Sequence, residues 1–319
     1  MIIVTGGAGF VGSNLVRHLN DAGVTNILIV DDLRDGRKIF NLADCRFVDY
    51  LDKDEFLARV TAGRGAMPAV SGIFHQGAFT DTTQWDGRLM MENNFEYSKQ
   101  LLHFCQEHEI SFIYASSASV YGSGREFRVA VECERPINAY AFSKWQFDQY
   151  VRATVHQPRS QVAGLRYFNV YGPREAHKER MASVVYHFHR QLSRGDEVRL
   201  FTGSGGYGDG EQRRDFVHVD DIAAINLWFL EHPDTSGIFN AGTGTSRSFN
   251  AIARAVIDWH GQGKISYIEF PAELTGSYQS FTEADLTELR SAGYAESFLS
   301  VEEGVRRYLD VLGSSDESR

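Results

Sequence analysis

The chain has little cysteine and no long apolar run. Its 319 residues include only three cysteines, Cys45, Cys105 and Cys133, which are scattered along the sequence. An odd, dispersed set favours neither a disulfide framework nor a zinc site, so we expect reduced thiols and a cytoplasmic location. No apolar run approaches the ~20 residues that span a bilayer, and the N-terminus lacks the pattern of a signal peptide. We therefore expect no membrane segment.

Positive charge is also scarce. Lys and Arg total 32 against 42 Asp and Glu, which gives a formal net charge of −10. This balance argues against a surface that binds nucleic acid. The 11 histidines form no recognised zinc spacing, so we expect no metal site. The composition, with 43% hydrophobic and 23% charged residues, is typical of a globular protein, and 319 residues are enough to bury a sizeable core.

The N-terminus carries the pattern of strand, glycine turn and helix. Residues 2–5 are apolar, three glycines follow at a three-residue spacing, and residues 10–22 have helical periodicity. Such glycines let the backbone turn tightly and approach a pyrophosphate, which the helix N-terminus then stabilises. The sequence thus predicts a dinucleotide site. Its predicted phosphate contacts are Gly6, Gly9, Phe10, Val11 and Gly12.

A second apolar run, residues 27–30, ends in Asp31 and Asp32. An acidic side chain at this place usually accepts hydrogen bonds from the adenosine ribose hydroxyls, which favours NAD. Basic residues lie nearby in the sequence, and such cations pair with the 2′-phosphate of NADP. From these residues alone the choice between NAD and NADP stays open. The cations are Arg34, Arg37, Lys38 and Lys53.

A tyrosine and a lysine four residues apart are the strongest catalytic signal. Tyr140 and Lys144 begin a predicted helix over residues 140–156, so they share one helical face. A lysine ammonium there is expected to lower the pKa of the phenol and make it usable as an acid or base. Upstream, residues 111–115 form an apolar run that leads to Ser116 and Ser117. Ser117 is expected to hydrogen-bond the same substrate oxygen.

Apolar runs alternate with helical patterns through the first half of the chain. This alternation predicts an α/β fold: a Rossmann doubly wound parallel sheet with a smaller, mixed C-terminal substrate domain. The predicted dinucleotide domain covers residues 1–168, with returns near 216–243; residues 169–215 and 244–319 form the substrate domain. Predicted strands lie at residues 2–5, 27–30, 45–49, 71–76, 111–115 and 160–166. A later strand is expected at 237–240, and the tail after 245 reads as mostly helical.

Together, the glycine turn, the serine strand and the Tyr140–Lys144 pair resemble the extended short-chain dehydrogenase/reductase family. Residues 75–78, 166–173, 214–221 and 239–243 extend the resemblance over nearly the whole chain. It implies a bound nicotinamide dinucleotide; Phe79 departs from the pattern, because a small or thiol residue is common there. The implied cofactor contacts beyond the glycine turn are Asp31, Asp32, Lys38, Lys53, Gln76, Gly77, Ala78, Phe79, Thr80, Asn93, Lys144, Val170 and Lys178.

Within that family, four further strings are similar to the 6-epimerases of ADP-activated heptose: residues 82–87, 171–178, 181–183 and 278–286. The chain departs from that branch at Glu179 and Arg180, where Gly-Ser is common, and its 205–212 loop is longer. The substrate contacts that the resemblance implies are Asn169, Arg180, His187, Phe201, Thr202, Gly203, Ser204, Arg214 and Tyr278.

The same resemblance implies the chemistry. Tightly held NADP oxidises the C6″ alcohol of ADP-D-glycero-D-manno-heptose to an aldehyde and reduces it from the opposite face, with NAD as the alternative cofactor. Tyr140 and Lys178 would be the two acid/base groups, Lys144 would hold the cofactor ribose, and Ser117 would bond the reacting oxygen. The product, ADP-L-glycero-D-manno-heptose, would supply the inner core of lipopolysaccharide. The family also implies a homo-oligomer, with a pentamer expected.

Three other functions share parts of this sequence pattern. A sugar-nucleotide 4,6-dehydratase needs an acid pair after the strand-end hydroxyl, and Ala118 and Ser119 stand there instead. A UDP-sugar 4-epimerase shares Ser117 and the Tyr140 pair but gives Lys178 no role. A catalytically silent NADP-binding sensor typically loses the tyrosine or the lysine, and this chain keeps both.

Overall fold

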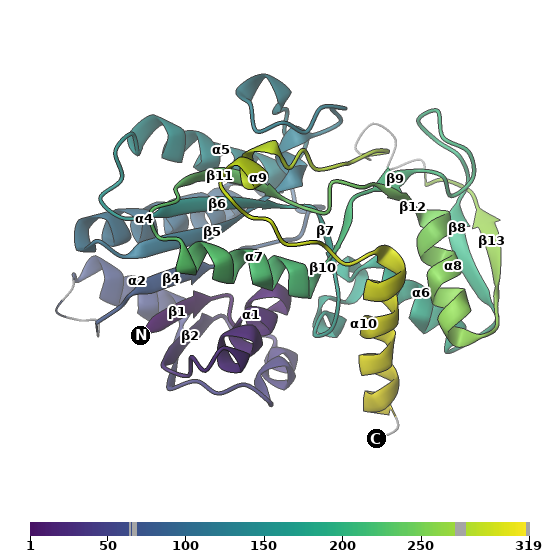
Figure 1. The fold of residues 1–319 in the computed structure, drawn as a ribbon, viewed down its shortest axis with the longest axis horizontal. Coiled ribbons are helices and arrows are strands. Elements are labelled where there is room, and N and C mark those ends of the chain that lie inside the picture. Colours follow the sequence, from purple (N-terminus) through teal and green to yellow (C-terminus); the bar gives the residue numbers. More distant parts are fainter. Residues whose placement is uncertain (64, 66–68, 272–278, 317–319) are drawn as a thin grey trace.

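A parallel sheet of seven strands forms the centre of the chain, as seen in a computed structural model that describes residues 1–63, 65, 69–271 and 279–316 (Figure 1). The strand order is β11-β6-β5-β4-β1-β2-β3, and every neighbouring pair is parallel. The strands are β1 (Ile2–Thr5), β2 (Ile27–Asp31), β3 (Asp49–Asp52), β4 (Gly72–His75), β5 (Ser111–Ser117), β6 (Val162–Tyr167) and β11 (Gly237–Ala241).

Helices cover both faces of this sheet, because the strands are apolar on both sides. One core lies under α1 (Phe10–Asp21), α7 (Val219–Glu231) and α9 (Thr287–Ser291). The other lies under α2 (Lys53–Thr61), α4 (Tyr97–His108) and α5 (Ala139–Thr154). The predicted Rossmann-like α/β fold is therefore confirmed. Shorter helical turns are η1 (Gly36–Leu42), α3 (Gly87–Met90), η3 (Met91–Glu96), η4 (Ala118–Tyr121) and η5 (Val131–Cys133).

A separate hydrophobic core belongs to the C-terminal part of the chain, which lies beyond one end of the sheet (Figure 1). Parallel strands β8 (Glu197–Phe201) and β13 (Lys264–Ile268) pack there with three helices, α6 (Val184–Leu192), α8 (Phe249–His260) and α10 (Val301–Asp316). Two small ribbons join this part to the sheet. They are β7 (Asn169–Tyr171) with β10 (Phe216–His218), and β9 (Arg213–Arg214) with β12 (Arg247–Ser248).

One secondary-structure expectation is wrong, and one strand was not predicted. The strand expected at residues 45–49 is β3, which begins only at Asp49. The reason is that the Asn20 side chain bonds both backbone groups of Arg46, at 2.6 and 2.8 Å, and keeps them from a strand partner. The tail after residue 245 is mostly helical as expected, with α8, α9 and α10, but it also holds β13, a strand on the edge of β8 that the sequence did not predict.

Two features expected to be absent were searched in the described ranges. None of the described helices is both long and apolar enough to cross a bilayer. Across the same residues, no cluster of three or more His, Cys, Asp or Glu side chains is placed to hold a metal ion.

Candidate active site

A cavity of about 770 Å³ opens at the carboxyl ends of the central strands, where the chain order reverses between β1 and β4. This is the crevice in which doubly wound sheets bind nucleotides. All the cofactor contacts predicted from the sequence line this cavity. Its far end reaches β8 and β9 of the C-terminal part, so one continuous space has room for a cofactor and a second molecule.

The glycine turn fits a pyrophosphate. Gly6 has a φ of +64°, and a Cβ added at Gly12 would lie 2.1 Å from the carbonyl oxygen of Gly6. A side chain at either position would therefore push the turn apart. Helix α1 has Gly9 as its N-cap residue and no capping side chain, which leaves amides of its first turn available to an anion.

Asp31, at the adenosine end, does not have the free carboxylate that the sequence suggested. It accepts hydrogen bonds from the amides of Ala8 (2.8 Å) and Asp32 (2.7 Å) and from Lys38 Nζ (2.8 Å). Three of its roughly four lone-pair sites are thus occupied within the protein. Asp32 is bound to the Arg34 side chain, which lowers its pKa. The two acids brace the turn and leave little acceptor capacity for ribose hydroxyls.

The cations at this end divide into two groups. Lys38 and Lys53 line the cavity, although each already contacts a carboxylate, Asp31 or Asp54. Arg37 is not among the lining residues, because its guanidinium binds Asp35 and Glu179. The expectation that Arg37 faces a 2′-phosphate is therefore not met in this arrangement.

Tyr140 and Lys144 lie one turn apart at the start of α5. The helix begins at Ala139 because Asn138 Oδ1 accepts a hydrogen bond from the amide of Ala141 at 2.8 Å. Lys144 Nζ donates to the carbonyl of Ala115 at 2.8 Å, which joins α5 to the serine end of β5. Burial lowers the pKa of Lys144 to about 8, an effect that Asp148 opposes.

The pKa of Tyr140 corrects one expectation. We expected the Lys144 ammonium to lower it, but burial raises it, and only a hydrogen bond with Ser117 acts in the lowering direction. The ammonium is directed at Ala115 instead of the phenol. The tyrosine is therefore held as a neutral phenol beside Ser117 in the chain as described.

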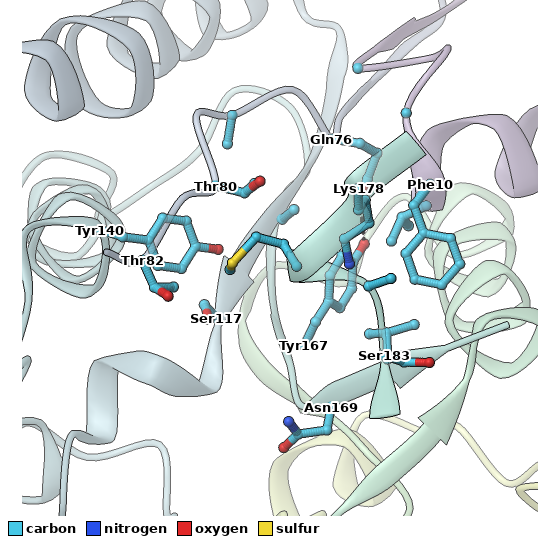
Figure 2. Close-up of a pocket in the computed structure, with 18 of the residues that line it drawn as sticks. Phe10, Gln76, Thr80, Thr82, Ser117, Tyr140, Tyr167, Asn169, Lys178 and Ser183 are labelled. Carbon is cyan, nitrogen blue, oxygen red and sulfur yellow. Dashed lines mark hydrogen bonds between the residues drawn. The ribbon is translucent and has the colours of Figure 1, made fainter. Parts of the chain in front are cut away.

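Lys178 lies on η6 (Ala176–Met181), on the other side of the cavity. In Figure 2 the Tyr140 phenol and the Lys178 side chain lie on opposite sides of a sulfur-containing side chain, and both residues line the cavity. Lys178 Nζ lies 4.9 Å from the centroid of the Phe10 ring, a cation–π contact. Burial lowers the pKa of Lys178, and the nearby charge of Glu175 opposes this effect. The lowered pKa makes Lys178 a better candidate for proton transfer than a solvated lysine.

The predicted substrate contacts are only partly brought together. Asn169, Phe201 and Arg214 line the cavity, whereas Thr202, Gly203, Ser204, His187 and Arg180 are not among its lining residues. Arg180 points instead to Asp81 (2.6 Å) and Thr83 (3.0 Å), and its side chain is 65% exposed. Tyr278 lies outside the described residues.

Sequence reasoning missed several residues at the substrate end. One of them, Arg199, had a readable signal, because it alternates with Phe201 on the same face of β8. Gln212 had a weaker one, since it stands two residues before Arg214; its amide bonds Thr202 and Ser204 at 3.2 and 3.1 Å. The missed lining residues are Met181, Ser183, Phe188, Arg199, Gln212 and Phe249.

The sheet order, the glycine turn and the Ser117–Tyr140–Lys144 group define an extended short-chain dehydrogenase/reductase. The NAD dependent epimerase/dehydratase family matches residues 2–242, and the chain belongs to it. Within it, the chain is 58% identical to the ADP-L-glycero-D-manno-heptose-6-epimerase of Alkalilimnicola ehrlichii over 315 residues, which are 99% of this chain and 98% of that protein.

Solved structures of nucleotide-sugar epimerases are also similar to this chain. The ADP-L-glycero-D-manno-heptose-6-epimerase of Helicobacter pylori is 31% identical with a TM-score of 0.82, over 98% of this chain and 96% of that one. The UDP-glucose 4-epimerase of Thermus thermophilus, in a complex with NAD, is 27% identical with a TM-score of 0.77, over 97% of both chains. The predicted family and the predicted heptose epimerase relatives are thus confirmed.

Proposed function

We propose that this chain is an epimerase that inverts C6″ of an ADP-activated heptose, converting ADP-D-glycero-D-manno-heptose to ADP-L-glycero-D-manno-heptose. The observation that carries the proposal is the placement of Tyr140 and Lys178 on opposite sides of one cavity. Inversion of one carbon requires hydride to leave one face and return to the other. A proton-transfer group on each side meets that requirement without a large rotation of the substrate.

A nicotinamide dinucleotide held by the glycine turn and Lys144 would supply the hydride acceptor and donor for this chemistry. One of the two groups, Tyr140 or Lys178, accepts the proton of the C6″ hydroxyl while the carbon loses hydride, which leaves an aldehyde. The other group returns a proton to the oxygen when hydride is added to the opposite face. Ser117 orients the Tyr140 phenol, and Arg214 at the far end is suited to the diphosphate.

We propose NADP as the cofactor, on the basis of Lys38 and Lys53 at the adenosine end of the cavity. The Asp31 carboxylate supports this assignment, because three of its roughly four lone-pair sites are already occupied and little capacity is left for ribose hydroxyls. The test is to denature the purified protein without added nucleotide and identify what it releases. Near-stoichiometric NADP(H) is expected, and NAD alone would overturn the assignment.

The rival functions make different predictions for turnover. A UDP-sugar 4-epimerase would act on UDP-galactose, and a sensor would hold NADP without turning over either sugar. A 4,6-dehydratase lacks its acids here, since Ala118 is buried and Ser119 is bonded to Ser117 at 2.9 Å. The decisive experiment is incubation with ADP-D-glycero-D-manno-heptose and, separately, UDP-galactose, followed by NMR of the products. Inversion at C6″ is expected; turnover of UDP-galactose alone, or of neither sugar, would reject the proposal.

A further inference from the structure

Glu175 is a buried carboxylate that the proposed chemistry does not use. It is 0% exposed and lies in the segment of residues 172–183, here called the bridging segment, which carries Lys178 from β7 to α6. Its oxygens accept hydrogen bonds from the amide and the hydroxyl of Ser183, both at 2.6 Å, and a long contact from the amide of Gly172 at 3.5 Å. These three donors belong to the bridging segment itself, and the Tyr308 hydroxyl of α10 also interacts with the carboxylate.

A buried carboxylate costs free energy unless a cation or several donors compensate it. Among the ion pairs formed by the described residues, none includes Glu175. The charge of Glu175 acts on Lys178, which lies one turn along the same segment; the backbone amide of Lys178 donates to the carbonyl of Glu175 at 2.9 Å. The two charges therefore sit on one short turn, one buried under the segment and the other directed into the cavity.

The geometry points to Glu175 as a positioning residue for Lys178. Its carboxylate fixes the bridging segment by binding Ser183, the N-cap residue of α6, and its negative charge favours the protonated form of Lys178. This inference rests on the proposed function for its catalytic meaning. The contact between the two residues can be tested without any turnover.

Other titratable groups also lie around Glu175 and Lys178 and could affect the protonation of Lys178. His177 lies beside Lys178 on the bridging segment, and Tyr308 of α10 faces Glu175. Tyr167 lines the cavity near Lys178 in Figure 2. Burial raises the pKa values of both tyrosines, so neither supplies negative charge near neutral pH. Glu175 is the group among these that supplies it.

The test measures the titration of Lys178 directly. The isolated protein is pulsed with an amine-acylating reagent at a series of pH values, and modification of Lys178 is quantified by peptide mass spectrometry. Glu175→Gln removes the charge while the amide still bonds Ser183. We expect it to move the acylation midpoint of Lys178 to lower pH by roughly 1 unit, the lower end of the range for a neighbouring opposite charge.

Two variants separate charge from fixation. Ser183→Ala weakens the clamp but keeps the carboxylate, so the midpoint should stay near that of the wild type. Glu175→Asp keeps the charge but withdraws it by one methylene, so an intermediate shift is expected; it carries the test if the glutamine variant does not fold. An unchanged midpoint in Glu175→Gln, or an equal shift in Ser183→Ala, would overturn the inference. If only the aspartate variant folds, an unchanged midpoint in that variant would contradict the expected intermediate shift and would also overturn the inference.

Activity adds a second readout. In the pH profile of epimerisation, the limb that needs protonated Lys178 falls as pH rises through its pKa, so Glu175→Gln should move that limb to lower pH by the same amount. Absence of epimerisation in the wild type would reject the proposed function while leaving the titration result intact. A normal pH profile combined with a shifted titration would reject only the catalytic meaning of Glu175.

Discussion

Glu179 is the residue whose backbone most clearly conflicts with its side chain. Its φ is +49° and its ψ is −118°, a conformation that glycine adopts freely and residues with a Cβ do not. Its carboxylate, 65% exposed, pairs with Arg37 across the mouth of the cofactor cleft. We predict that Glu179→Gly relieves strain and that Glu179→Ala keeps it.

The magnitude follows from three terms. Residues held in such sparsely populated regions cost on the order of 1–3 kcal/mol. Glycine removes this strain but adds unfolded-state entropy worth roughly 0.5–1 kcal/mol. The exposed ion pair contributes about 0–1 kcal/mol and is lost in both variants. The glycine variant should therefore exceed the alanine variant in free energy of unfolding by roughly 0.5–2 kcal/mol, and lie close to the wild type.

Urea unfolding of the three proteins, followed by tryptophan fluorescence, measures these differences. A repeat in 1 M NaCl screens the Arg37 ion pair, so the wild type should lose a little stability while the gap between glycine and alanine stays. An alanine variant as stable as the glycine variant would refute the strain argument. A gap that closes in high salt would show instead that the charge pair, and not the backbone, makes the difference.

Four further predictions concern catalysis, the cofactor and the core. Tyr140→Phe and Lys178→Met should each slow epimerisation by a factor on the order of 10² or more yet keep bound NADP, whereas Tyr150→Phe, on the surface side of α5, should stay near wild type. Epimerisation in D₂O should leave the carbon-bound hydrogens of the product unlabelled, as checked by NMR; deuterium at C6″ would show proton abstraction from carbon. Cofactor affinity, measured by fluorescence titration, should fall as pH rises through about 8, because Lys144 loses the charge that is present below that pKa; a Lys144→Met protein should not show this fall. Arg166→Met should cost about 3–5 kcal/mol in chemical unfolding, because it leaves two buried carboxylates without their shared cation; a loss below 1 kcal/mol would contradict this.

The sheet was predictable because each of its strands and crossover helices is recognisable from a short stretch of sequence. Each central strand is a short apolar run, and each crossover helix has its own periodicity, so the parallel α/β arrangement follows from their alternation. The errors arose where a distant residue decides. Asn20 delays the start of β3, and the half-exposed β13 is a strand because β8 provides an edge for it.

The candidate site likewise has features that local sequence predicts and features that distant residues decide. Motif spacing predicted the lining of the cofactor cleft, since the carboxyl ends of parallel strands meet at one edge. Spacing did not predict the partners of the charged side chains. Arg180 is drawn to Asp81, 99 residues away, and Arg37 to Glu179, 142 residues away. Such choices depend on which loops face each other across the cleft, which no local pattern encodes.

The bridging segment links the two parts of the chain at the cavity where we propose that the chemistry takes place. It leaves the sheet at β7, passes the cofactor cleft with Lys178, and ends at Ser183, the first residue before α6 of the C-terminal core. Arg37 and Asp81 hold its outer side to the loops after β2 and β4, while Glu175 holds its inner side to Ser183. A side chain fixed from both sides keeps its place as the substrate end of the cavity fills. Lys178 is therefore suited to act opposite Tyr140, which the sheet itself holds through Lys144 and Ala115.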